Sequence, residues 1–102
     1  MRMISTSKLI AALNAEMANI RRAGGLHQSG RVSELSIAQV EDNCELFCAV
    51  KAIKASYAEA VSISWIYGSG LGYIFQKARH GERSAQRVAD VINEFLKKEK
   101  RK

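Results

Sequence analysis

The chain contains no proline in its 102 residues. Proline lacks a backbone N–H donor and clashes with the preceding turn, so it interrupts helices more strongly than any other residue. Its absence permits long helices throughout the chain, and the 47% of hydrophobic residues is typical of a globular domain. The length fits one domain that can bury a core without a metal or disulfide. We therefore predict a single all-α domain over residues 1–102, a compact bundle of four to five helices.

Apolar spacing places the first two helices. The first is expected over 5–23, because Leu9, Leu13, Met17 and Ile20 recur at helical intervals. A loop over 24–35 follows, since this segment is rich in glycine and serine. The second helix is expected over 36–55, where Ser36 and the glutamine three residues later have capping-box spacing. Its expected apolar face consists of Ile37, Val40, Cys44, Phe47 and Val50.

The segment 57–80 supports two interpretations. Val61, Ile63, Trp65 and Tyr67 recur at every second position with Ser62 and Ser64 between the first three, and Gly68–Gly70 follow, which indicates a β-hairpin over 61–77. The flanking residues favour helix instead, so we predict two short helices, Tyr57–Ser64 and Ser69–Arg79, with the hairpin as the alternative. Gly81 then separates them from a C-terminal helix over 84–98, capped by Ser84. The inward face of that last helix is expected to hold Val88, Val91, Ile92, Phe95 and Leu96.

Positive charge is concentrated near the C-terminus. Residues 77–102 contain nine Lys or Arg and four Asp or Glu, so they carry +5 of the chain's +6. An imbalance of this kind favours an anionic partner, of which nucleic acid is the commonest. The cations over 97–102 have a second explanation, because a helix C-terminus itself attracts positive charge.

Several function classes lack the residues they require. The only candidate metal ligands of the soft type are Cys44, Cys48, His27 and His80, whose spacing fits no zinc finger, and we expect the cysteines to be buried apolar residues. The glycines of 68–72 lack the lysine and hydroxyl of a phosphate-binding loop. We expect no cofactor, no metal, no small-molecule substrate and no enzymatic activity. A cytoplasmic location is expected, because no apolar run has the length of a signal peptide or a membrane span.

The segments Gly70–Phe75, His80–Arg83 and Gln86–Val91 carry a resemblance to a known family. Residues 57–96 resemble the helix-turn-helix of phage-repressor-type DNA-binding domains, among them the N-terminal domain of the phage Mu transposition ATPase. The resemblance departs from the family at the tight turn, where Trp65 stands in place of glycine. It implies a small DNA-binding regulator of phage or plasmid type, acting as a dimer.

If that motif is present, its geometry assigns the contacts. The outer face of the second helix would read bases, and the cations around the following turn would hold phosphates. The expected nucleic-acid contacts are Ser69, Tyr73, Gln76, Lys77, Arg79, Arg83 and Arg87.

The second hypothesis is a helical protein-interaction module, an inhibitor or adaptor that docks on a larger protein. It rests on the apolar, glycine-punctuated segment 65–75, because small residues permit close approach and aromatic side chains are favoured anchors. Its expected interface residues are Trp65, Tyr67 and Phe75.

Overall fold

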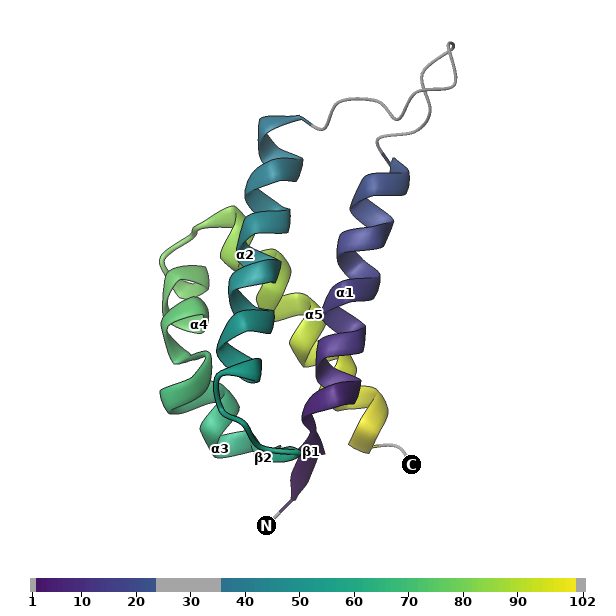
Figure 1. Ribbon diagram of the computed structural model, residues 1–102. Helices are drawn as coiled ribbons and strands as arrows, with labels where there is room; N and C mark the ends of the chain where they lie inside the picture. The colour runs from purple at the N-terminus through teal and green to yellow at the C-terminus, as the bar shows by residue number, and fades with distance from the viewer. Residues whose placement is uncertain (1, 24–35, 101–102) are drawn as a thin grey trace.

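The computed structural model describes residues 2–23 and 36–100. Four long or medium helices build most of this part, α1 (Thr6–Ala23), α2 (Ile37–Lys54), α4 (Gly72–Arg79) and α5 (Arg83–Lys100). α2 lies between α1 and α4, and α5 crosses behind them, as Figure 1 shows. The predicted all-α bundle is confirmed. None of the helices in the described ranges has the length and apolar character that crossing a membrane requires.

The core lies where α1, α2 and α5 meet. The buried residues Leu9, Leu13 and Ile20 come from α1, and Val88 and Ile92 come from α5. These were predicted core positions, and their partners Met17, Val91 and Phe95 pack against the same cluster as partly buried residues. Helical spacing therefore located the inner faces of the first and last helices correctly.

α2 begins with the capping box that its sequence predicts. The Gln39 backbone N–H donates to Ser36 Oγ at 3.2 Å, and the Ser36 N–H donates to Gln39 Oε1 at 2.8 Å. α5 begins one residue earlier than expected, at Arg83, and its predicted cap Ser84 is buried. Ser84 Oγ lies 3.4 Å from Glu45 Oε1 of α2 instead. The predicted loop over 24–35 falls outside the described residues.

The helix predicted over Tyr57–Ser64 is wrong. Strand β2 (Ala60–Ser62) lies there and pairs antiparallel with β1 (Met3–Ser5), with Ile4 opposite Val61. Thr6 fixes the extended backbone, because its hydroxyl donates to the carbonyls of Ala58 at 2.7 Å and Glu59 at 3.0 Å. The strand partner is therefore the N-terminus, and the predicted hairpin over 61–77 does not form.

Residues 63–79 are helical with a kink. α3 (Ile63–Trp65) runs into a wider π turn, η1 (Ile66–Gly70), and α4 follows. Gly68 interrupts the segment with φ −107° and ψ −107°, and the Leu71 N–H donates to the Ile66 carbonyl at 3.0 Å. Gly70 is required here because a Cβ atom at this position would lie 2.5 Å from the Trp65 ring. The second predicted helix, Ser69–Arg79, is thus shortened to Gly72–Arg79.

Gly81 ends α4 as predicted. Its φ is +91°, a conformation that residues with a side chain rarely adopt. The Glu82 N–H donates to the Lys77 carbonyl and the Gly81 N–H donates to the Ala78 carbonyl, each at 3.1 Å, which is a Schellman turn. This turn reverses the chain so that α5 starts beside α2.

Candidate functional site

Lys77, a predicted nucleic-acid contact, forms an ion pair inside the fold. Its Nζ atom lies 2.9 Å and 3.0 Å from the two carboxylate oxygens of Glu45, and 4.0 Å from Glu82. The hydrogen bond to Glu45 is the main cause that raises the pKa of Lys77 above its ordinary value. The charge of Lys77 is therefore balanced by a carboxylate of α2.

Arg83 and Arg87, two further predicted contacts, converge on one buried carboxylate. Asp42 of α2 is 2% exposed, and its oxygens lie 2.7 Å from Arg83 Nη1 and 3.1 Å from Arg87 Nε. Arg83 also donates to the Ala38 carbonyl at 3.0 Å, and Arg87 lies 2.6 Å from Glu16 of α1. These arginines bind α5 to both other long helices.

These ion pairs change what the basic segment can do. The charge of each of the three cations is already balanced by a carboxylate, so each attracts a phosphate less than an unpaired cation would, and separating the pairs would leave the buried Asp42 and Glu45 without counter-ions, which is costly. Glu45 and Asp42 of α2 thus serve as counter-ions for α4 and α5, respectively. Charge counted along the sequence overstated the field that these three residues present to a partner.

The remaining predicted contacts are on the surface. Gln76 and Arg79 are exposed on α4, and Ser69 is exposed in η1. Tyr73 is half-exposed, with Lys77 Nζ 5.7 Å from its ring centroid. The structure brings Tyr73, Gln76 and Lys77 together around a shallow hollow at the end of α4, which His80 also lines.

The lysines near the end of α5 have both cations and carboxylates as neighbours. Lys97 and Lys100 of α5 line a hollow of about 510 Å³ together with Arg2. Asp90 and Glu94 line the same hollow. Cations and carboxylates alternate there, so this surface is not uniformly positive.

The aromatic residues of the interaction hypothesis are only partly available. Trp65 and Phe75 are partly buried and pack against the core. Tyr67 is exposed, but its hydroxyl donates to Asn93 Oδ1 at 2.6 Å and its ring lies 4.6 Å from that of Phe75. Burial raises the pKa of the Tyr67 hydroxyl. Trp65 and Phe75 thus contribute to the core, and the Tyr67 hydroxyl links η1 to α5.

The largest disagreement with the sequence analysis concerns the face of α2. Its predicted inner residues are exposed, with 81% for Ile37, 47% for Val40 and 54% for Phe47, and Cys44 is exposed with them. Only Val50 of the predicted set is buried. The buried face instead holds Asp42, Glu45, Leu46, Ala49, Val50 and Ile53.

We name the exposed residues Ile37, Val40, Cys44 and Phe47 the α2 stripe. Sequence periodicity found these residues but put them on the wrong side, because α2 is apolar on two opposite faces. The opposite face, which carries Asp42 and Glu45 among its apolar residues, is the core face. The signal that could have revealed the stripe is the presence of two apolar faces on one helix, which a domain-surface helix does not need.

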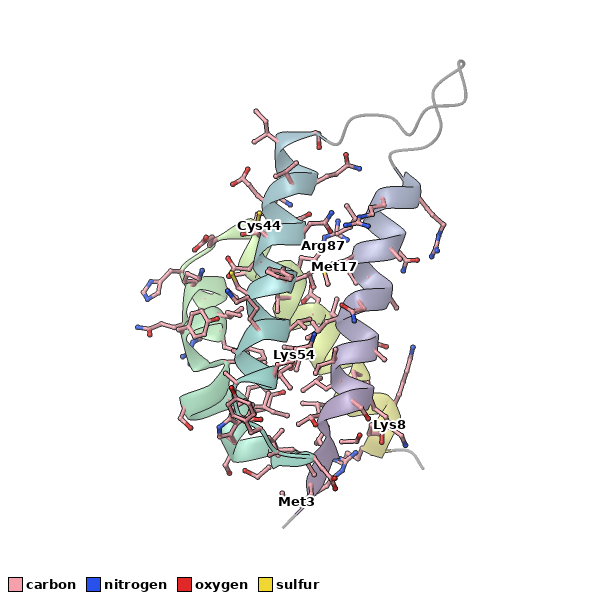
Figure 2. All side chains as sticks on the ribbon, in the orientation of Figure 1. Met3, Lys8, Met17, Cys44, Lys54 and Arg87 are labelled. Carbon is pink, nitrogen blue, oxygen red and sulfur yellow. The ribbon has the colours of Figure 1, made fainter. Side chains whose placement is uncertain are left out.

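Charged residues flank the α2 stripe. Glu41 is exposed beside its N-terminal half, and Lys51 and Lys54 are exposed toward its C-terminal end. Lys51 Nζ lies 5.8 Å from the centroid of the Phe47 ring. Figure 2 shows Cys44 on the outer side of α2 and Lys54 near its other end.

Cys48 also belongs to the exposed side of α2, so the expectation that both cysteines are buried is wrong. Neither is in a disulfide. In the ranges 2–23 and 36–100, no group of three or more His, Cys, Asp and Glu side chains is arranged to hold a metal ion. His27, one of the four residues considered as ligands, lies outside these ranges.

Comparison with protein-family models, with curated proteins and with solved structures finds no match for this chain. The fold defines the class of protein, a mainly helical domain with one small two-stranded sheet in its described part. The features of the described residues that bear on function are therefore the ion pairs and the α2 stripe.

Proposed function

We propose that this chain is a protein-interaction module that docks another polypeptide on the α2 stripe. The observation that carries the proposal is the exposure of Ile37, Val40 and Phe47 in one line along α2. Contiguous apolar side chains rimmed by charges are characteristic of protein-binding surfaces. The proposal keeps the interaction hypothesis and moves its site from 65–75 to α2.

The chemistry of the stripe defines the kind of partner. Its residues follow one another at steps of three and four positions, which is the spacing that an apposed helix fills with its own apolar side chains. Phe47 supplies the aromatic anchor, and Lys51 and Glu41 supply polar contacts at the rim. The expected partner therefore presents an amphipathic helix.

Site-specific photo-crosslinking tests this proposal. A photoreactive phenylalanine analogue at position 47 should form an adduct with a polypeptide in the cell that produces the chain. The matched control is position 3, because Met3 is 55% exposed and lies in β1, away from α2 (Figure 2). The adduct should be absent at position 3 and lost in Val40→Glu. Equal labelling at both positions would contradict the proposal.

A second candidate is nucleic-acid binding by the exposed end of α4. Its support is the grouping of Gln76, Arg79 and His80, all exposed, on a chain of net charge +6. Arg79 would hold a phosphate and Gln76 an adenine edge, since these are the contacts their side chains make. The helix-turn-helix resemblance remains a prediction alongside it.

A salt series in a duplex mobility-shift assay tests the second candidate. Arg79→Ala should lower the salt dependence of binding by about one phosphate contact, and Arg21→Ala, an exposed arginine of α1, is the control. The absence of any shifted complex at low salt would refute it.

A further inference from the structure

We infer that the partner of the α2 stripe is a second copy of this chain, whose own α2 packs against the first in antiparallel orientation. The inference rests on the proposed function and specifies its partner. A contact of one surface with its own copy is isologous and closes on a two-fold axis, which is the commonest form of assembly among soluble proteins.

The spacing of α2 is self-complementary. The α2 stripe continues through Lys51 and Lys54 with alternating steps of three and four residues, the repeat of a helix–helix seam. A two-fold axis that passes through the exposed face midway between Cys44 and Phe47 pairs Cys44 with the partner's Phe47 and Val40 with the partner's Lys51. The same axis brings Ile37 against the partner's Lys54. Ile37 and Val40 then meet the aliphatic stem of a lysine, and Phe47 meets the partner's Cys44.

Charge selects the antiparallel direction. In this orientation Glu41, which flanks Val40, lies one residue from the level of the partner's Lys51 and within the span of its long side chain, and symmetry produces the same pair a second time. Parallel helices in register would instead bring Glu41 near the partner's Glu41 and Lys51 near the partner's Lys51. Like charges at an interface oppose association, so the single exposed acid of the first half, Glu41, and the exposed lysines of the second half, Lys51 and Lys54, favour the antiparallel pair.

The cysteines provide an independent distance marker. The two-fold axis that sets Glu41 one residue from the level of the partner's Lys51 also sets Cys48 one residue from the level of the partner's Cys44. Both thiols are exposed on the isolated chain, so a reagent can reach them. The two thiols are also one helical turn apart within a single chain, so the test mixes a Cys44→Ser chain with a Cys48→Ser chain, and a short bis-maleimide should join these two chains covalently.

Sedimentation equilibrium of the full chain under reducing conditions tests the inference. The wild type should form a dimer over roughly 1–200 µM, the range of ordinary moderate affinities. Lys51→Glu should raise the dissociation constant by about tenfold or more, because two like-charge contacts replace two opposite-charge contacts. Glu41→Lys combined with Lys51→Glu should restore the dimer, since both pairs are merely reversed. Met3→Glu, at an equally exposed position outside α2, should leave the dissociation constant unchanged.

A monomer at every concentration would overturn the inference, and so would a double variant as weak as Lys51→Glu alone. Both substituted positions are exposed, so circular dichroism should show that the variants fold like the wild type. The photo-crosslink at position 47 separates the two proposals. If the chain is monomeric and the adduct contains a different polypeptide, the second-copy inference fails and the proposed function stands. If position 47 forms no specific adduct and the chain is monomeric, both fail.

Discussion

The cluster around Asp42 predicts an asymmetry in stability. Asp42 is 2% exposed, whereas the side chains of Arg83 and Arg87 are 52% and 42% exposed. Removing the carboxylate lets both arginines regain water, and each keeps another partner, the Ala38 carbonyl or Glu16. Removing both arginines leaves a buried carboxylate without a counter-ion, which is the more costly error.

The magnitudes follow from this difference in burial. Two charge-assisted hydrogen bonds contribute about 1.5–3 kcal/mol each before desolvation is counted. Asp42→Ala also removes the desolvation cost of burying a carboxylate, and alanine has the better helix propensity. These two gains offset much of that sum. We expect Asp42→Ala to lower the free energy of unfolding by about 1–2 kcal/mol. The double variant Arg83→Met and Arg87→Met should lower it by about 3–5 kcal/mol.

Urea denaturation at one fixed protein concentration measures both effects, because concentration itself changes the stability of an associating chain. With a denaturant dependence of about 1–2 kcal/mol per molar, the two variants should differ by roughly 1–2 M in midpoint. Adding Asp42→Ala to the double arginine variant should then recover stability. If Asp42→Ala is the most destabilised of the three proteins, the argument from burial is refuted.

Three further changes test other parts of the fold. Gly70→Ala should lower the unfolding free energy by about 1–3 kcal/mol in urea denaturation, because its Cβ atom would overlap the Trp65 ring; an unchanged midpoint would contradict the close approach. Gly81→Ala should lower it by about 1 kcal/mol, since its φ of +91° strains any side chain, and the melting temperature reports this. The pKa of Lys77 is raised in the folded protein, chiefly by its hydrogen bond to Glu45. The ion pair therefore contributes its full share of the unfolding free energy below the unfolded-state pKa of Lys77, and this share is lost as the pH rises through the higher folded-state pKa. The stability difference between wild type and Lys77→Met should therefore stay constant from neutral pH to about 10 and shrink above it; a difference that grows with alkaline pH would contradict this sign.

Local signals predicted the parts of the fold that local forces determine. The bounds of α1, α2 and α5 follow from apolar spacing and from the Ser36 capping box. The orientation of α2 could not be predicted in this way, because it depends on where the cations of α4 and α5 meet Asp42 and Glu45. A single helix with two apolar faces does not specify which one is buried.

The segment 57–62 was mispredicted for a similar reason. Its composition favours helix, yet the hydroxyl and N–H of Thr6, more than fifty positions earlier, bind the carbonyls that a helix would use. Pairing of β1 with β2 then fixes Ala60–Ser62 as extended. The candidate site was predicted only in part for the same reason. The sequence indicated that Lys77, Arg83 and Arg87 belong to one basic group, but not that carboxylates of other helices pair with them.

The pairing of β1 with β2 has a consequence for the order of folding. Closing a loop from Thr6 to Glu59 in an unstructured chain costs about 3.5 kcal/mol beyond the constant term, which is more than a few backbone hydrogen bonds return. Packing of α1 against α2 lowers this closure cost, because the start of α1 then lies near the end of α2 (Figure 1). The strands are therefore a late event, formed after the α1–α2 hairpin, and contacts of Thr6 should influence the unfolding rate far more than the folding rate.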